Sequence, residues 1–329
     1  MTTPLTDTFG RVHNNLRISV TDRCNLRCNY CMTEDVEFME RSELLTFEEV
    51  TRFVKIAATL GINKIRLTGG EPLMRKDLHK LIAMLAGVSG IQDVGLTTNG
   101  IFLPDQAQKL RDAGLGRINI SLDTLDPVRF RELTRRDALD PTIEGILAAK
   151  AAGFDPVKIN AVAMRGITEH EVVPLAKFAR EHQLEMRFIE YMPIGADQWE
   201  RDKVYFAHEI LEQIEDHVAP LVPAEDYDPR APAMEFEYSD GGGRVGIIAS
   251  ISRPFCRNCN RVRLTADGKL RNCLFATEET DVKQLIRGKA SDDAIAAVIR
   301  RNVHDKWEGH EINTSRFIKP LRTMHSIGG

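Results

Sequence analysis

Residues 17–31 read RISVTDRCNLRCNYC, in which a short run of alternating polar and apolar residues precedes three cysteines within eight positions. The run at 17–21 has the composition of a β-strand, so the Cys-x3-Cys-x2-Cys segment would form a loop at the end of that strand. Three thiols are one fewer than the four protein ligands of a closed zinc site or a fully ligated iron–sulfur cluster. A metal centre held by Cys24, Cys28 and Cys31 would therefore keep one position open.

The strand at residue 17 is the first of six runs with strand composition, and the others begin at residues 63, 93, 117, 157 and 185. Strands that alternate with helices predict a parallel α/β sheet. Six units are fewer than the eight of a closed TIM barrel, so the residues allow either an incomplete barrel or an open doubly wound sheet. Amphipathic helical patterns separate the runs over residues 47–60, 77–88, 104–113, 142–152 and 169–182.

The composition of the chain changes at residues 219–243, which contain four prolines and three glycines and show little hydrophobic periodicity. We interpret this stretch as a boundary or a long excursion, and predict one domain over 1–218 and a C-terminal region over 219–329. The latter should contain a strand at 244, a hairpin that turns at Asp267-Gly268, and two helices. The terminal RTMHSIGG resembles an uncapped, frayed tail on physical grounds alone.

Composition excludes several classes of protein. The 44 Lys and Arg residues nearly balance 48 Asp and Glu, so the whole molecule lacks the charge expected of a nucleic-acid-binding or anionic-membrane-binding protein. The N-terminus lacks a basic and then apolar leader, and no apolar run approaches the roughly 20 residues of a membrane span. We therefore expect a cytoplasmic protein, whose six cysteines serve a metal rather than disulfides.

Four of the expected strands alternate in a way that fully covered parallel strands do not. Arg17, Arg66, Asn119 and Lys158 each lie between apolar neighbours. If helices cover the apolar face, the polar face lines an interior that must hold water or a polar ligand. Arg17, Arg66 and Lys158 would then converge on a cavity suited to an anion such as a phosphate chain. An edge or antiparallel arrangement, with the polar face in solvent, is the alternative.

A second cysteine triplet lies in RPFCRNCNRVRLTADGKLRNC, where six basic residues accompany a single acid, Asp267. Cys256, Cys259 and Cys273 again supply three ligands, and the nearby sequence offers no His or Cys as a fourth for structural zinc. A second 4Fe-4S cluster with an open iron is the better interpretation. For the first triplet the zinc alternative would need His13 or a distant residue.

The first triplet, with Tyr30 before its last cysteine, strongly resembles the signature of the radical S-adenosylmethionine (SAM) superfamily. Thr68-Gly69-Gly70-Glu71-Pro72 resembles the GGEP element of that superfamily. The resemblance implies that three thiolates hold three irons of a 4Fe-4S cluster, while the fourth iron takes the amino and carboxylate groups of SAM. It also implies SAM contacts from Thr98 or its neighbours and from five further residues: Tyr30, Gly70, Glu71, Ser121 and Met192.

Over nearly the whole chain, the motifs resemble one family within that superfamily, the GTP 3′,8-cyclases of molybdenum cofactor biosynthesis. The resemblance rests on RISVTDRC at 17–24, CRNCNRVRL at 256–264 and the terminal Gly328-Gly329. It implies an incomplete (βα)6 TIM-like barrel with a C-terminal cluster-binding extension, and a second 4Fe-4S cluster whose open iron binds the guanine of GTP. Catalytic roles are implied for Arg17 and for a tail that ends in Gly328 and Gly329. The implied GTP-binding residues are Arg17, Arg66, Thr97, Lys158, Arg261 and Arg263.

The activity implied by this resemblance is conversion of GTP to 3′,8-cyclo-7,8-dihydro-GTP through a 5′-deoxyadenosyl radical that abstracts the ribose 3′ hydrogen. The implied partners are an electron-donating reductase and a downstream cyclic pyranopterin synthase, with a homodimer possible and neither nucleic acid nor membrane bound. A rival function is that of a twin-cluster radical SAM enzyme that modifies peptides. A zinc-binding regulator that contacts nucleic acid through residues 253–273 is a rival from another class.

Overall fold

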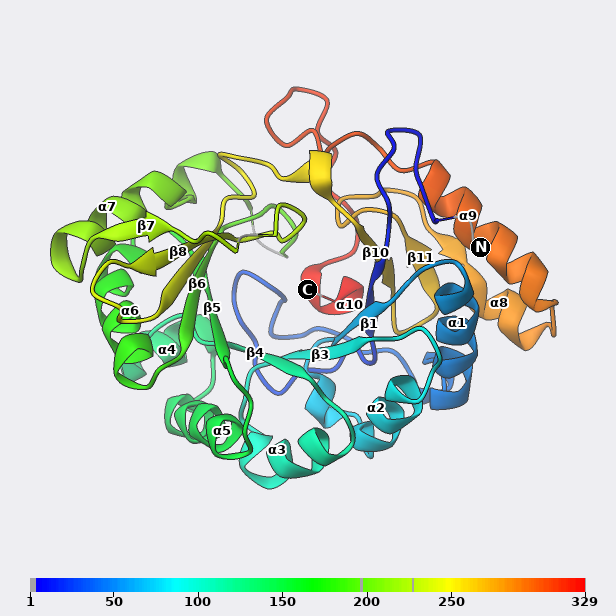
Figure 1. Ribbon diagram of the computed structural model, residues 1–329, viewed down its shortest axis with the longest axis horizontal. Helices are drawn as coiled ribbons and strands as arrows, with labels where there is room; N and C mark the ends of the chain where they lie inside the picture. Colours follow the sequence, from blue (N-terminus) through cyan, green and yellow to red (C-terminus); the bar gives the residue numbers. More distant parts are fainter. Residues whose placement is uncertain (1–3, 196–197, 227, 329) are drawn as a thin grey trace.

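The computed structural model describes residues 4–195, 198–226 and 228–328. Its centre is one twelve-stranded sheet that curves around an interior, and most helices cover its outer side (Figure 1). The strand order is β12-β11-β10-β1-β2-β3-β4-β5-β6-β9-β8-β7. Within the described residues the two end strands, β12 and β7, do not pair with each other. The fold is therefore an incomplete TIM-like barrel, as expected.

The six expected strands form the middle of the sheet, and all of them run parallel. Each lies within two residues of its expected start. They are β1 (Asn15–Ser19), β2 (Lys64–Thr68), β3 (Asp93–Thr98), β4 (Arg117–Ser121), β5 (Lys158–Ala163) and β6 (Glu185–Glu190).

The helices between these strands, and the helix that follows β6, pack on the outer side of the sheet (Figure 1). The first begins at Phe47 because Thr46 caps it: the Thr46 hydroxyl accepts from Glu49 N, and the Glu49 carboxylate accepts from Thr46 N. The helix α4 was not predicted from the sequence, although Asp126 and Pro127 are a typical helix start. The helices are α1 (Phe47–Thr59), α2 (Leu78–Ala86), α3 (Leu103–Asp112), α4 (Pro127–Thr134), α5 (Leu139–Ala151), α6 (Val172–Glu181) and α7 (Ala207–His217).

The C-terminal third adds strands to both edges of the same sheet. β9 pairs parallel with β6, whereas β10 pairs parallel with β1. The stretch at 219–243 is not a plain linker, since it contains two antiparallel strands, and the expected hairpin at Asp267-Gly268 joins β10 to β11. The added strands are β7 (Leu221–Pro223), β8 (Met234–Tyr238), β9 (Arg244–Ile248), β10 (Arg261–Leu264), β11 (Lys269–Arg271) and β12 (Thr280–Asp281).

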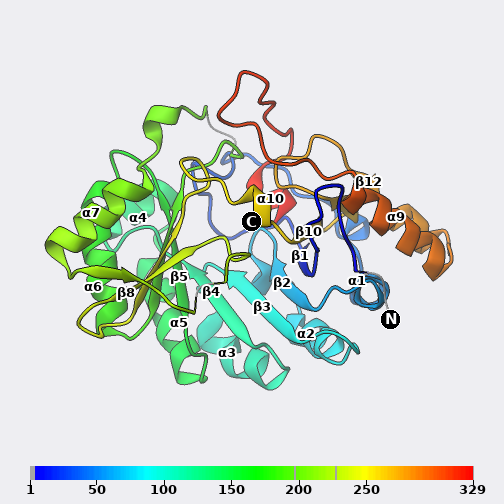
Figure 2. The same ribbon diagram turned by 45° about the horizontal axis from the view of Figure 1, so that its top comes forward.

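Three helices follow in this region: α8 (Val282–Arg287), α9 (Asp292–His304) and α10 (Met324–Ile327). The first two are the expected pair, and α9 contacts α1 on the outer side of the barrel. The short α10 differs, because it lies in the middle of the ring of strands in both views (Figures 1 and 2). The described part of the chain thus ends inside the barrel.

Alternation along the strands separates the core from this interior. Ile18, Leu67 and Ile120 are completely buried in the hydrophobic core, whereas Arg17 and Arg66 are only partly buried and line the interior cavity. The polar face of the sheet therefore points inward, as the sequence pattern predicts. None of the helices in the described part of the chain has the length and apolar character that a membrane crossing requires.

Candidate active site

A cavity of about 550 Å³ fills the interior of the barrel. This volume is in the range typical of small-molecule sites. All six cysteines line it, together with polar residues from β1 to β6 and from β10. The six cysteines, all within the described residues, form no disulfide. The fold therefore brings two triplets, 225 or more residues apart in the chain, to one chamber.

The loop that carries the first triplet is locked to the end of β2. Gly70 N donates to Thr21 O at 2.8 Å, and Glu71 N donates to Arg23 O at 2.7 Å. A Cβ atom at Gly70 would lie 2.4 Å from Arg23 O, so only glycine permits this approach. The Gly-Gly-Glu-Pro element thus positions the cysteine loop through its backbone.

Glu71 is buried and joins the ends of neighbouring strands. Its carboxylate accepts hydrogen bonds from Leu73 N at 2.9 Å, Thr98 Oγ1 at 2.7 Å and Asn99 N at 2.7 Å. Burial raises the pKa of Glu71 to about 7 despite these donors. The side chain is thus engaged by the protein, which leaves backbone atoms of this turn as the groups available to a ligand.

Tyr30 and Asp123 connect the cysteine loop to the opposite wall. The Tyr30 hydroxyl donates to Asp123 Oδ2 at 2.6 Å, and Val162 N donates to Asp123 Oδ1 at 2.8 Å. Burial raises the pKa of Asp123, and burial together with the Asp123 charge raises the pKa of Tyr30 well above its usual range. The residues expected to contact SAM all line the cavity near this loop or at strand ends: Tyr30, Gly70, Glu71, Thr98, Ser121 and Met192.

The second triplet flanks β10 and β11, next to β1, and lies in a cationic environment. Lys306 Nζ lies 3.3 Å from Cys259 Sγ and donates to Arg261 O at 2.8 Å, while Arg261 Nη2 lies 3.4 Å from the same sulfur. Burial opposes ionisation of Cys259, but Arg261 and Lys306 prevail and lower its pKa to about 5. Lys306 was not predicted as a site residue, because it follows α9 and belongs to no recognisable sequence motif.

An N-terminal segment closes this side of the chamber. The Arg11 guanidinium donates to the carbonyl oxygens of Cys256 at 2.8 Å, Glu308 at 2.6 Å and Trp307 at 2.5 Å. His13 is completely buried, and its Nδ1 lies 2.9 Å from Arg11 O. His13 is not part of the cavity lining, so its position does not suit a fourth ligand for the first triplet.

The donor sets fit clusters better than single ions. Across residues 4–195, 198–226 and 228–328, no three His, Cys, Asp or Glu side chains are arranged to hold one metal ion. Thiolates on one zinc ion all lie about 2.3 Å from the same point. Cluster thiolates instead bind separate irons, so they are spread further apart. The six cysteines that line the cavity, three at each site, suit the wider spacing of cluster ligands.

Three arginines form a row across neighbouring strands on the cavity side. Arg17 of β1 is in register with Arg263 of β10 on one side and with Arg66 of β2 on the other. Burial lowers the pKa of Arg17 to about 9, with a further contribution from Arg261, and burial with Arg117 and Arg17 lowers that of Arg66 to about 9. The row is therefore a set of mutually repelling, desolvated cations that an anion would stabilise.

Two further cations differ, because carboxylates already pair with them. Lys158 Nζ lies 2.7 Å from Glu185 Oε2, and Arg187 contacts both Glu185 and Glu235. The six residues expected to bind GTP all line the cavity: Arg17, Arg66, Thr97, Lys158, Arg261 and Arg263. The structure adds Lys64, Arg117 and Arg187 to this lining. Strand parity could have found Lys64 and Arg117, each two residues before an inward-facing position.

The C-terminal tail reaches the arginine row. Arg263 Nη1 donates to Gly328 O at 2.8 Å. Ile327 is 1% exposed, so the physical expectation of a frayed tail is wrong for this segment. Gly328 lies where expected from the resemblance, while Gly329 lies outside the described residues.

Comparisons with known proteins agree with this geometry. The family model "Radical SAM superfamily" matches residues 18–179, and "Molybdenum Cofactor Synthesis C" matches residues 184–312. In its fold the chain resembles Streptococcus suis SuiB bound to S-adenosylmethionine, with a TM-score of 0.60 over 87% of this chain and 68% of that one. Because the two sequences are only 16% identical, this likeness concerns the fold alone.

Relatives named GTP 3′,8-cyclase match along their full length. The protein from Rhodopirellula baltica is 46% identical over 100% of this chain and 94% of its own, and that from Thermodesulfovibrio yellowstonii is 43% identical over 98% and 99%. The protein from Streptomyces coelicolor is 44% identical over 99% and 96%. These matches do not favour the peptide-modifying alternative. The chain belongs to the GTP 3′,8-cyclase family of the radical SAM superfamily.

Proposed function

We propose that this chain converts GTP to 3′,8-cyclo-7,8-dihydro-GTP, an early step of molybdenum cofactor biosynthesis. One observation carries the proposal: both cysteine triplets and the row formed by Arg17, Arg66 and Arg263 face one cavity. SAM is a sulfonium cation and GTP is a polyanion. The carboxylates Glu71 and Asp123 lie on the side of the first triplet, whereas uncompensated arginines lie beside the second. The side of the cavity near the first triplet therefore favours the cationic SAM, and the side near the second triplet favours the anionic GTP.

Two 4Fe-4S clusters and SAM are the cofactors of this family. We assign the first cluster to Cys24, Cys28 and Cys31 and the second to Cys256, Cys259 and Cys273. When bound, the first cluster supplies the electron that cleaves SAM to methionine and a 5′-deoxyadenosyl radical, which abstracts the 3′ hydrogen of the GTP ribose. The C3′ radical would then bond to C8 of guanine, and the resulting guanine-centred radical would take up one electron from the electron donor and one proton to give the 7,8-dihydro product.

The residues of the chain act chiefly by positioning. Arg17, Arg66 and Arg263 would take the triphosphate, since guanidinium groups fix the geometry of phosphate oxygens as well as their charge. Thr97, Lys158 and Arg261 complete the expected GTP site. Tyr30, Gly70, Ser121 and Met192 would bound the SAM site, with Glu71 holding the turn from behind. A shared chamber places the two reactants together and limits access of water.

The catalytic assignment of the tail that ends in Gly328 and Gly329 is supported at Gly328, whose carbonyl oxygen accepts a hydrogen bond from Arg263. Through this hydrogen bond, the tail would hold Arg263 in position within the GTP site. Arg17, in register with Arg263, would act on the same phosphate chain.

We further propose an external reductase as electron donor, a cyclic pyranopterin synthase as the consumer of the product, and a homodimer as the assembly. A cytoplasmic location is supported by six cysteines without disulfides. We retain a functional division after residue 218, with the second cluster and the GTP-binding hairpin in the C-terminal part.

Anaerobic reconstitution tests the proposal. The purified protein should be brown, with iron and sulfide each near eight per chain. Incubation with GTP, SAM and dithionite should then yield 5′-deoxyadenosine and consume GTP in equal amounts, as followed by liquid chromatography and mass spectrometry. A colourless protein that binds zinc, or 5′-deoxyadenosine formation that ignores GTP, would contradict it.

A further inference from the structure

The chain crosses from the outer surface to the interior just before α10. Leu321 is fully exposed, whereas His325 is 8% exposed and Ile327 is 1% exposed. The change is complete within six residues. Ile318 and Leu321 are exposed before the crossing, so a contact at the crossing itself would fix where the tail enters the barrel.

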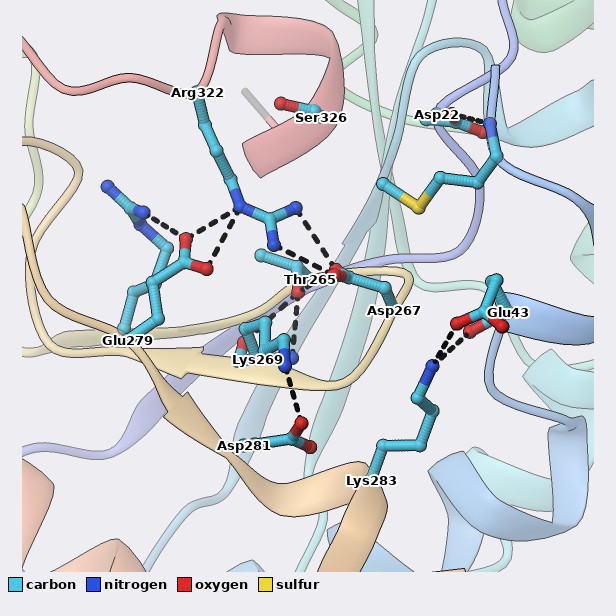
Figure 3. Close-up of polar contacts among 12 residues, drawn as sticks. Asp22, Glu43, Thr265, Asp267, Lys269, Glu279, Asp281, Lys283, Arg322 and Ser326 are labelled. Atoms are coloured by element: carbon cyan, nitrogen blue, oxygen red, sulfur yellow. Dashed lines mark hydrogen bonds and ion pairs between the residues drawn. The ribbon is translucent and has the colours of Figure 1, made fainter.

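Arg322 makes that contact (Figure 3). Its guanidinium donates to both oxygens of Asp267, at 3.1 Å and 2.7 Å, and its Nε lies 2.7 Å from the Glu279 carboxylate. The three side chains are between 14% and 22% exposed. Forked pairs of this kind, partly shielded from solvent, hold geometry better than single surface ion pairs.

Both carboxylates are themselves held in place. Asp267 accepts from the Thr265 hydroxyl at 2.6 Å within the β10–β11 turn. Glu279 also pairs with the guanidinium of Arg271, a side chain that is 2% exposed. The anchor for Arg322 is therefore part of a fixed network, so the guanidinium has one favoured position.

Beyond Arg322 the described tail residues themselves carry no fixed charge. Residues 323–328 read TMHSIG and contain no charged group other than the titratable His325. Ser326 N and Ile327 N donate to Thr323 O, and Gly328 N donates to Met324 O. The end of this segment fits tightly, because a Cβ on Gly328 would lie 2.5 Å from Thr68 Oγ1. A slip of one residue that brought Ile327 to this place would put a side chain into that space.

The anchor and the target of the tail lie on one hairpin. Asp267 is in the turn of the hairpin, and Arg263, which donates to Gly328 O, is on its first strand. The distance between the two points is thus set by four residues of β-structure and turn. We propose that Arg322, clamped between Asp267 and Glu279, is a positioning residue that sets the register of the C-terminal tail and so places the Gly328 carbonyl on Arg263.

The inference deepens the proposed function, since its effect on turnover depends on Arg263 serving the GTP site. The effect on the tail itself needs no substrate. Hydrogen–deuterium exchange of the anaerobically reconstituted enzyme, read by mass spectrometry over residues 322–328, measures it directly. In Arg322→Gln the amides of Ser326, Ile327 and Gly328 should exchange at least about tenfold faster, as expected from loss of one charge-assisted pair.

Two variants control the measurement. Arg316 lies on the same segment, is 75% exposed and pairs with Glu311 at 2.8 Å, so Arg316→Gln should leave exchange unchanged. In the double variant Arg322→Gln/Asp267→Asn, the tail amides should exchange no faster than in Arg322→Gln alone, because both substitutions disrupt the same ion pair. Wild-type exchange in Arg322→Gln, or additive effects in the double variant, would overturn the proposal.

Turnover supplies the second arm. Arg322→Gln should lower kcat for GTP about tenfold or more, with iron content and the thermal midpoint unchanged, and Arg322→Lys should recover part of the loss. Full kcat with a released tail would overturn the positioning role. Failure of the wild-type enzyme to consume GTP would refute the proposed function instead, while the exchange measurement would still decide the role of Arg322.

Discussion

The two cysteine triplets offer the same number of thiols but differ in their electrostatic surroundings. Burial and the nearby Glu71 raise the pKa of Cys24 to about 11, and burial with neighbouring cysteines and Asp123 raises that of Cys28 well above its usual range. At the second triplet, Arg261 and Lys306 outweigh burial and lower the pKa of Cys259 to about 5. Three cysteines can thus form two sites with different functions, because the residues around each triplet determine whether the site favours a cationic or an anionic ligand.

The contrast gives each half of the cavity a separate task. The carboxylate side suits a cationic reagent, and the guanidinium side suits an anionic substrate. Both halves belong to one cavity, so on this proposal the two ligands would lie next to each other, each on the side that suits its charge. Substitutions that act on one half should therefore leave the other half intact.

Removal of one triplet should produce the largest effect. Cys24→Ala should abolish 5′-deoxyadenosine formation, whereas Cys256→Ala should keep some of it but reduce GTP consumption to about a thousandth or less, since the substrate is no longer placed. Iron should fall from about eight to about four per chain in each variant. Full iron content in Cys256→Ala would show that the second triplet is not a cluster site.

Loss of an uncompensated cation should come next. Arg17→Ala should weaken GTP binding by about 10- to 100-fold, as measured by equilibrium binding under anaerobic conditions, because a desolvated phosphate contact is lost. Lys158→Ala should cost less than about tenfold, because Glu185 already pairs with this lysine.

The matched control is Arg301→Ala, whose side chain is 87% exposed on α9. Its GTP affinity and the iron content of all three variants should equal those of the wild type. Unchanged affinity in Arg17→Ala would count against an inward-facing arginine row.

A single methyl group on the tail should have a smaller effect. In Gly328→Ala the new Cβ would lie 2.5 Å from Thr68 Oγ1 and 2.9 Å from Ser19 Cβ, at a φ of +87°. The tail should shift from Arg263 and kcat should fall about tenfold. Gly153→Ala has a similar φ of +81° but open space around it, so it should lower stability while it spares kcat. Equal kcat values for Gly328→Ala and Gly153→Ala would show that the tail has no role in catalysis.

The smallest effect concerns Lys306. Lys306→Met removes a cationic donor 3.3 Å from Cys259 Sγ, so the reduction potential of the second cluster should fall by about 60–130 mV. A redox titration followed by EPR in the Cys24→Ala background isolates that cluster. Lys306→Arg should retain most of the wild-type potential, and an unaltered potential in Lys306→Met would show that the contact has no electronic role.

The sequence predicted the parts of the fold that depend on local pattern. Alternation in β1 and β2 marked Arg17 and Arg66 as inward-facing, because side-chain parity in a strand is fixed by backbone geometry. The turn at Asp267-Gly268 was likewise predicted from a local pattern, the Asp-Gly pair itself. The helix α4 shows that even a local signal, Asp126 before Pro127, can be overlooked.

Other features depend on contacts that no local pattern records. Lys306 and Arg11 reach the second triplet from positions distant in the chain, and Glu185 neutralises Lys158 from the adjacent strand. The placement of β7 to β9 on one edge and β10 to β12 on the other follows from long-range packing. The tail is the clearest case: its composition suggests disorder, while Arg322, Asp267 and Arg263 hold it inside the barrel.

EPR of the two single-triplet variants tests the central claim, that each half of the chamber receives its own ligand, most directly. In reduced Cys256→Ala, which keeps the first triplet, added SAM should alter the cluster signal and GTP should not. In reduced Cys24→Ala, which keeps the second, GTP should alter the signal and SAM should not. Signals that respond to neither ligand, or to the opposite one, would contradict the account.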